Sequence, residues 1–328
     1  MSAVNVIAEV GMTHDGSLGH AIRMAETAAE CGVDAVKFQL HDAQAETTRG
    51  APSPPYFKHE TRWEYFERTA FTDDEWARLK QASEDAGVEF LCSVFSVEAV
   101  ERLEGIGVGR YKIGSGEVTN LELVRRVAET RKPVLLTSGM SSWAELDAAV
   151  TAAGDDVTVL QCTSQYPTPP ERVGLNVFAE LRERYARPVG FSDHTLGNVA
   201  AFAAVTLGAT VVEKHFTLSR DMYGPDARFA TEPAEFEELV DGIRELETML
   251  ANPIDKDDLA PLAEMKEVFE KSVVSTREIP AGAAISRDMV AAKKPGTGIP
   301  ARMLPEVLGR TARVDIAADT VLTEDLLA

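Results

Sequence analysis

The amino-acid sequence predicts a (β/α)₈ barrel, which is a TIM barrel, followed by a small β-rich module. The barrel is indicated by eight short runs rich in Val, Ile, Leu and Phe, with amphipathic segments of helical period between them. Eight such units over about 250 residues are typical of this fold. A doubly wound open sheet is the alternative, but the sequence has no dinucleotide-binding glycine fingerprint, which makes it the second choice.

Each predicted strand is short and apolar, as parallel strands buried on both faces are. The strands are expected at residues 5–10, 34–40, 89–95, 110–114, 133–137, 157–162, 188–191 and 210–216. Helices are predicted between or after them at residues 21–31, 73–86, 143–153 and 235–250. Capping residues support these ends, because Thr72 and either Ser141 or Ser142 can begin a helix and Gly32 and Gly87 can end one.

Residues 41–72 interrupt the alternation after the second predicted strand. They are rich in proline and aromatic residues, including APSPPYF and RWEYFER. An insertion in a βα loop lies on the catalytic face of a barrel, so it could form a lid or a substrate wall. A packed surface loop fits the composition equally well.

The composition excludes several classes of protein. With a net charge of −20 the surface repels phosphate backbones, so nucleic-acid binding is not expected, and an anionic substrate needs cations placed locally. No apolar run approaches the length of a membrane span. Cys31, Cys92 and Cys162 form no CxxC pair, so neither a disulfide framework nor a zinc ribbon is expected, and a reducing cytoplasm suits the chain.

Polar residues occur at the carboxyl end of nearly every predicted strand, where barrel enzymes carry their catalytic groups. In chain order they are Glu9, His14, Lys37, Gln39, Lys112, Ser115, Glu117, Thr137, Ser138, Gln161, Thr163, Ser164, Tyr166, Ser192, Asp193, His194, Glu213, Lys214 and His215. One such residue could be a satisfied core group. A polar group at the same end of so many strands predicts a pocket.

Two features of this set indicate its chemistry. Lys37 and Lys112, with nearby serines, would form a cationic site suited to a phosphate and a carboxylate together. His194 and His215 end neighbouring strands, so their imidazoles could hold one divalent ion with positions open for substrate. Such an ion would activate a carbonyl as a Lewis acid.

At these residues the sequence resembles the bacterial sialic acid synthase family, the nonulosonate synthases. The matching stretches appear in the family's order and span nearly the whole chain. They are IAEVGMTHDGS, DAVKFQ, YKIGSGE, PVLLTSGM, CTSQYPTP, GFSDHTLG, EKHFTL, GPD and KKPGTG. The resemblance implies a metal-dependent enzyme that condenses phosphoenolpyruvate with an N-acetylmannosamine-like sugar aldehyde, breaks a C–O bond and releases phosphate.

The resemblance also implies domains and residue roles. The barrel would span residues 1–255, a linker 256–270 and a SAF, or antifreeze-like, domain 271–328. Glu9, Lys112, His194 and His215 would be catalytic, and the two histidines would hold Mn²⁺, with Mg²⁺ or Co²⁺ as alternatives. The substrates would be bound by Lys37, Gln39, Ser115, Glu117, Thr137, Ser138, Ser164, Tyr166, Ser192, Asp226 and Lys294. The family implies a homodimer in which the terminal domain covers the partner's site.

Three positions depart from the family pattern. Thr13 stands where an asparagine is usual, and Ser164 replaces another asparagine. Lys294 replaces an arginine that touches the acyl group of the sugar, and lysine lacks the planar fork of that arginine. The sugar is therefore left open, with pseudaminic, legionaminic and non-acetylated precursors as alternatives.

Other functions remain as alternatives. The chain could make another 2-keto-3-deoxy sugar acid, or it could be an aldolase that uses pyruvate through a lysine Schiff base. From a different class, it could be a catalytically silent sugar-binding relative. Retention of Glu9, both lysines and both histidines favours the synthase.

Overall fold

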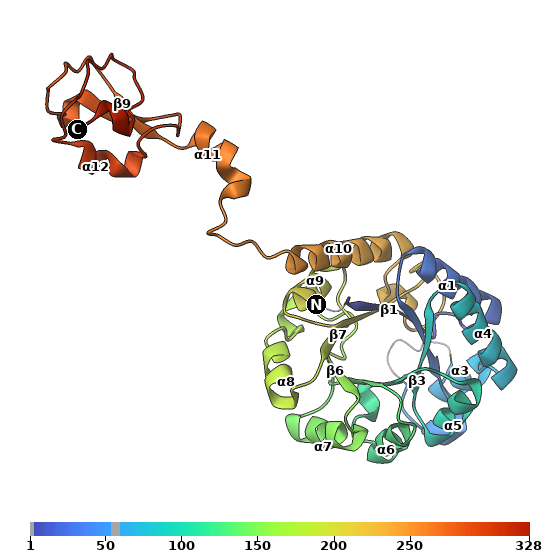
Figure 1. The fold of residues 1–328 in the computed structure, drawn as a ribbon. Coiled ribbons are helices and arrows are strands. Elements are labelled where there is room, and N and C mark those ends of the chain that lie inside the picture. The colour runs from blue at the N-terminus through green and yellow to red at the C-terminus, as the bar shows by residue number, and fades with distance from the viewer. Residues whose placement is uncertain (1–2, 54–59) are drawn as a thin grey trace. The chain divides into compact units, whose positions relative to one another are not determined.

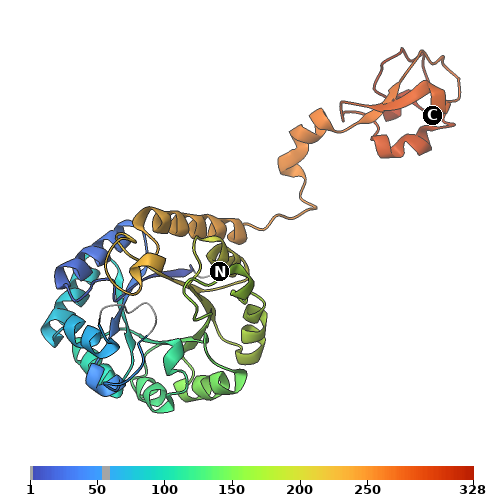
Figure 2. The same ribbon diagram turned by 180° about the vertical axis from the view of Figure 1, so that it is seen from behind.

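The computed structural model of the chain describes residues 3–53 and 60–328. It divides into two compact units, Met1–Asn252 and Pro253–Ala328. The first unit is a closed barrel of eight parallel strands with helices around it (Figure 1), and Figure 2 shows the same ring from behind. The predicted TIM barrel is confirmed.

The eight strands pair in sequence order, and β1 closes the barrel by pairing with β8 from Asn5↔Val211 to Glu9↔His215. Each strand lies within a few residues of its predicted position. Their bounds are β1 Asn5–Gly11, β2 Ala35–Leu40, β3 Glu89–Val94, β4 Tyr111–Ile113, β5 Val134–Thr137, β6 Val157–Cys162, β7 Val189–Asp193 and β8 Val211–His215.

The helices of the first unit cover the outer surface of the barrel. Most follow the strand before them directly, as the βα repeat requires. Their bounds are α1 Leu18–Glu30, α2 Ala43–Glu46, α3 Arg62–Thr69, α4 Asp73–Asp85, α5 Val97–Ile106, α6 Leu121–Glu129, α7 Trp143–Ala153, α8 Val177–Tyr185, α9 Val199–Thr206 and α10 Pro233–Ala251. The capping predictions hold at α4 and α7, where Thr72 and Ser142 each form a capping box with a glutamate.

Alternation along the strands separates two cores. Residues such as Val6, Val36 and Phe38 point outward and pack under the helices. Residues on the opposite parity form a small apolar layer inside the barrel, made of Ile7, Ala35, Leu91, Leu135, Leu160 and Val211. The next inward positions on several of these strands are polar, so the interior changes from apolar to charged toward the carboxyl ends.

The insertion contributes α2 and α3, although its residues 54–59 lie outside the described part of the chain. Thr61 begins α3 with a capping box, and Tyr65 is buried against the barrel with its hydroxyl donating to the Met12 carbonyl at 3.2 Å. Arg62, Tyr65 and Phe66 line a cavity. The described part of the insertion therefore forms a wall of that cavity.

The second unit has its own apolar core, which includes Val273, Ile285, Ile316 and Leu322. Its strands β9 Ser272–Ser275 and β10 Val290–Lys293 pair antiparallel, and its helices are α11 Ala263–Phe269 and α12 Leu304–Val307. The predicted β-rich terminal module is confirmed. Among the described residues, no helix is both long and apolar enough to cross a bilayer.

Candidate active site

A cavity of about 690 Å³ opens at the carboxyl ends of the barrel strands. It shares residues with a second cavity of about 390 Å³, which extends toward the insertion. Thirteen polar or charged residues and one cysteine line the larger cavity: Glu9, Lys37, Gln39, Arg62, Ser93, Lys112, Ser115, Thr137, Cys162, Ser164, Ser192, Glu213, Asp226 and Arg228. Tyr166, His194 and His215 line it as well.

Two buried ion pairs form the base of the larger cavity. The Lys112 Nζ lies 2.6 Å from both carboxylate oxygens of Glu213, and the Ser192 hydroxyl donates to the same carboxylate at 3.1 Å. The Lys37 Nζ lies 2.7 Å from the Glu9 Oε2 and 3.7 Å from the Glu213 Oε1. All four charged side chains are at most 5% exposed. The two ammonium groups and two carboxylates cancel in formal charge.

Burial and charge shift the pKa values of this group in different directions. Burial alone would raise the pKa of Glu213, but Lys112 and Lys37 together lower it to about 2. Burial lowers the pKa of Lys112, and the repulsion of Lys37 adds to that effect against the attraction of Glu213. The pKa of Glu213 is lowered because this carboxylate faces two ammonium groups. The pKa of Lys112 is lowered as well, because its ammonium group is buried and faces a like charge besides its one bonded carboxylate.

Glu9 is held at the cavity by two donors. Besides Lys37, the Gln39 Nε2 donates to the Glu9 Oε1 at 2.6 Å. Burial raises the pKa of Glu9, and the neighbouring Glu213 raises it further, against the lowering effect of Lys37. A carboxylate with a raised pKa suits proton transfer at neutral pH.

Gly11 allows this arrangement. The pairing of β1 with β2 shifts register between Glu9 and Gly11, and Gly11 has φ +54°, which favours glycine. A Cβ at this position would lie 3.1 Å from the Asp226 Oδ2, 3.2 Å from the Gln39 Nε2 and 3.4 Å from the Glu9 Oε1. The absence of a side chain at Gly11 therefore lets these polar groups converge.

His194 and His215 lie beside each other, with ring centroids 5.5 Å apart. The His194 Nδ1 lies 2.9 Å from the carbonyl oxygen of Thr163, so Nδ1 carries the proton and Nε2 is left as a lone-pair donor. The Nδ1 of His215 is buried and has no hydrogen-bond partner among the residues that the structure describes. Burial lowers the pKa of His215 well below its usual value, so this ring is neutral and able to bind a metal.

Most of the predicted hydroxyl and sugar-binding residues line one of the two cavities. The larger cavity is lined by Ser115, Thr137, Ser164, Tyr166, Ser192 and Asp226, and the second one by Glu117 and again Asp226. Ser138 lines neither, because its hydroxyl bonds to the Leu160 carbonyl at 3.1 Å. Lys294 belongs to the second unit, where its Nζ lies 4.8 Å from the centre of the Phe269 ring.

Several cavity residues were given no role by the sequence. Glu213 was expected in the pocket and is the most important of them, because it bonds Lys112 and lies on the same inward face of β8 as His215. The spacing of two between Glu213 and His215 was the signal that could have linked it to the metal and phosphoenolpyruvate residues. Ser93 is bonded to Lys37 at 2.8 Å, and Arg62 and Arg228 add cations to the wall.

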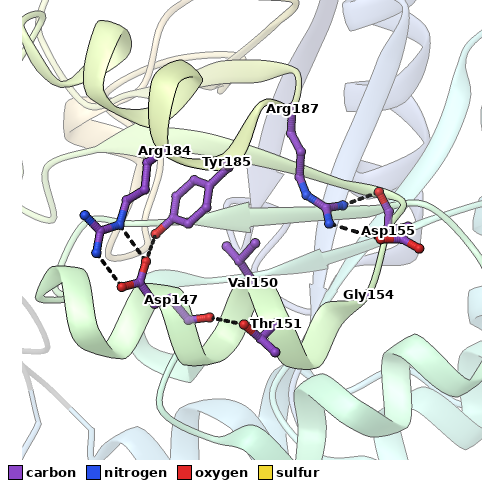
Figure 3. Close-up of a pocket in the computed structure, with 8 residues that line it drawn as sticks. All are labelled: Asp147, Val150, Thr151, Gly154, Asp155, Arg184, Tyr185 and Arg187. Carbon is purple, nitrogen blue, oxygen red and sulfur yellow. Dashed lines mark hydrogen bonds and ion pairs between the residues drawn. The ribbon is translucent and has the colours of Figure 1, made fainter.

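A separate cavity of about 440 Å³ lies between α7 and α8 on the outside of the barrel (Figure 3). The Arg184 Nε donates to the Asp147 carboxylate at 2.6 Å, and Arg187 lies 3.2 Å from the Asp155 Oδ1. Tyr185 donates to the same Asp147 carboxylate at 2.9 Å. The Arg184–Asp147 pair joins α8 to α7, and the Arg187–Asp155 pair joins the segments that follow them. Both guanidinium groups of this cavity are therefore paired with acids and do not form a reactive centre.

Comparison with known proteins agrees with this geometry. The N,N'-diacetyllegionaminic acid synthase of Campylobacter jejuni is 32% identical over 99% of this chain and 100% of its own length. The human N-acetylneuraminate-9-phosphate synthase is 34% identical over 98% of this chain and 92% of its own. The crystal structure of an N-acetylneuraminic acid synthetase from Leptospira borgpetersenii, in complex with citrate, covers 81% of this chain and 91% of its own with a TM-score of 0.72 and 28% identity. A SAF domain profile matches residues 270–328 and a NeuB family profile matches residues 24–255, and the chain therefore belongs to the NeuB family.

Proposed function

We propose that this enzyme condenses phosphoenolpyruvate with an open-chain amino-sugar aldehyde and releases phosphate, as a nonulosonic acid synthase does. Membership of the NeuB family, whose enzymes carry out this phosphoenolpyruvate-dependent condensation, supports the reaction class. The observation that carries the proposal is the cavity base, where two lysines meet two carboxylates beside a pair of histidines.

Phosphoenolpyruvate would bind against Lys37 and Lys112, with the hydroxyls of Ser115, Thr137 and Ser192 completing its contacts. Because the charges of the base cancel, the trianionic substrate needs further positive charge at the site. The arginines of the cavity wall and a divalent cation would supply it. The lysines would then neutralise the charge that grows on phosphate and carboxylate as the C–O bond breaks.

His194 and His215 fit a divalent metal ion. One has a ring nitrogen oriented by a carbonyl, and the other has a buried nitrogen without a partner in the described part of the chain. No group of three or more His, Cys, Asp or Glu among the described residues could hold a metal. Two ligands leave positions for substrate oxygens, so a bound Mn²⁺ would act as a Lewis acid on the aldehyde carbonyl.

Glu9 would orient and deprotonate the water that takes part in the reaction. After C3 of phosphoenolpyruvate has attacked the aldehyde, C2 carries an electron-poor oxocarbenium centre and takes up a water molecule. Glu9, which bonds to Lys37 and Gln39, would orient that water and accept its proton. The tetrahedral carbon then expels phosphate with cleavage of its C–O bond.

The amino sugar would occupy the second cavity, near Gln39, Glu117 and Asp226, with Tyr166 over His194. Tyr166 lines the larger cavity, where its ring centroid lies 4.1 Å from that of His194. A homodimer would bring Lys294 of the terminal domain to the partner's site, with domains over 1–255 and 271–328 and a linker between. Three buried free cysteines suit an enzyme of the reducing cytoplasm. Light scattering of the purified chain tests the dimer.

Phosphate release tests the function directly. Phosphoenolpyruvate is incubated with N-acetylmannosamine, its 6-deoxy diacetamido analogues or mannose, each with EDTA and with added Mn²⁺. We expect metal-dependent release with at least one amino sugar and none with EDTA. Phosphoenolpyruvate labelled with ¹⁸O at the bridging oxygen should give labelled phosphate. No release with any sugar would refute the proposal.

The metal site has a matched pair of variants. His215→Ala removes one ligand, whereas His20→Ala makes the same change on the exposed face of α1. We expect H215A to abolish turnover and to lose Mn²⁺ binding in calorimetry, and H20A to keep both. Retention of Mn²⁺ binding by H215A would exclude His215 as a ligand.

A further inference from the structure

His41 lies between two phenylalanines at the edge of the second cavity. Its ring is stacked on Phe66 of α3 at 3.8 Å and on Phe95 at 4.1 Å, nearly parallel to both, at 7° and 18°. The side chains of His41 and Glu46 are each 8% exposed. The stack leaves the ring nitrogens pointing along its edges.

Both of these nitrogens are used. The His41 Nδ1 lies 2.7 Å from the Glu46 Oε1, and the Nε2 lies 3.0 Å from the Gln39 Oε1. The second oxygen of Glu46 accepts from the Asp42 backbone at 3.3 Å, which fixes the carboxylate. On its other side the amide of Gln39 donates to Glu9 at 2.6 Å. A continuous chain of hydrogen bonds therefore runs from Glu46 through His41 and Gln39 to Glu9.

The hydrogen bonds from Glu46 to Glu9 require one orientation of the Gln39 amide. The carboxylates of Glu46 and Glu9 only accept, so the Gln39 NH₂ faces Glu9 and its oxygen faces His41. The Gln39 oxygen then lies toward the His41 Nε2, at 3.0 Å. Rotation of the Gln39 amide by half a turn would set its oxygen against the Glu9 carboxylate. The contact with the His41 ring therefore holds the Gln39 amide in the orientation that reaches Glu9.

We propose that His41 is a positioning residue, which fixes the carboxamide of Gln39 and through it the carboxylate of Glu9 for the sugar half of the reaction. This inference rests on the proposed function. It also gives the insertion a role, because α2 supplies Glu46 and α3 supplies Phe66. Packing alone does not explain His41, since an aromatic ring without nitrogens would fill the stack equally well.

The test uses His41→Phe, which keeps an aromatic ring between Phe66 and Phe95 and removes both ring nitrogens. We expect the KM for the sugar to rise and kcat to fall, so that kcat/KM for the sugar decreases about tenfold to a hundredfold, as loss of a hydrogen bond to a charged network would cause. The KM for phosphoenolpyruvate should stay within about twofold. His20→Phe on the exposed face of α1 is the matched control and should leave both constants unchanged.

A double-mutant cycle separates positioning from a direct role. If His41 acts through Gln39, H41F in the Q39A background should cost little beyond Q39A alone. Additive losses would overturn the proposal, as would an H41F enzyme with wild-type constants or with an equal loss for both substrates. If H41F does not fold, Glu46→Ala replaces it, with a smaller loss in the same direction and the same non-additivity with Q39A.

A structural readout keeps this test separate from the proposed function. Absence of turnover in the wild-type enzyme with every sugar would refute the condensation without deciding the role of His41. The crystal structure of H41F decides it in that case. The positioning role predicts that the Gln39 amide leaves Glu9, whereas an unchanged contact, at 2.6 Å as in the wild type, would contradict it.

Discussion

Replacement of Glu213 by leucine should destabilise the barrel strongly, because it leaves Lys112 buried without a carboxylate. The pair has bonds of 2.6 Å to both oxygens, and its side chains are 2% and 5% exposed. Removing one partner of a buried ion pair costs about 3–5 kcal/mol. The lowering of the Glu213 pKa from 4.5 to about 2 corresponds to about 3 kcal/mol, which agrees with that range.

Urea denaturation followed by tryptophan fluorescence measures this loss in the full chain. Trp63, Trp76 and Trp143 all lie in the first unit, so the signal reports the barrel alone. Glu129→Leu is the control, because Glu129 is 69% exposed and its pair with Arg126 is 3.7 Å long. We expect the control to change the free energy of unfolding by no more than about 0.5 kcal/mol.

Two further comparisons separate the ion pair from simple packing. The double variant K112M/E213L replaces both charges with apolar groups and should recover most of the stability that E213L loses. Because Glu213 has a lowered pKa in the folded state, its stabilising effect is present above about pH 4.5 and is lost as the pH falls toward 2. A loss below about 1 kcal/mol in E213L, or a double variant less stable than E213L, would refute the reasoning.

Three other changes test the surroundings of the site. Gly11 has φ +54°, and Gly11→Ala places a methyl group 3.1 Å from the Asp226 carboxylate. The change should lower the free energy of unfolding in urea by about 1 kcal/mol and reduce phosphate release. Unchanged release would show that Asp226 can move aside. Burial lowers the pKa of His14 to about 3, so below about pH 6.5 the unfolded chain binds more protons than the folded one, and the free energy of unfolding decreases as the pH is lowered. From about pH 7.5 to 5 the wild type should lose about 2 kcal/mol more than H14F. Parallel pH profiles would contradict this. Lys214→Met leaves Asp193, its partner at 2.7 Å, buried and unpaired, and should lower the melting temperature strongly, whereas D193N/K214M should lower it less.

Much of the architecture follows from local pattern. Side chains alternate between the two faces of each strand, and this period of two is set by the backbone alone. It can therefore be recognised in one strand at a time, and it predicts which face carries Glu9, Lys37, Thr137 or His215. The carboxyl ends of parallel strands meet at one face, so their polar residues had to converge. This is why most of the predicted cavity residues line the cavity.

Ser138 shows where that reasoning stops. It follows Thr137 directly and has the same chemistry, yet its hydroxyl bonds to the Leu160 carbonyl and lines neither cavity. Residues beyond the last strand pair are no longer bound by the alternation. Their direction depends on the loop and on the neighbouring strand.

The sequence by itself determined the barrel, the terminal domain and the groups that the barrel gathers, because these depend on periods and motifs within short segments. Only the tertiary structure decided the pairing of those groups. Lys112 bonds to Glu213, which is 101 residues away, because barrel closure sets the heights of β4 and β8 inside the ring. The chain from Glu46 to Glu9 likewise depends on an insertion that folds back onto β2, and no pattern in one segment specifies that contact.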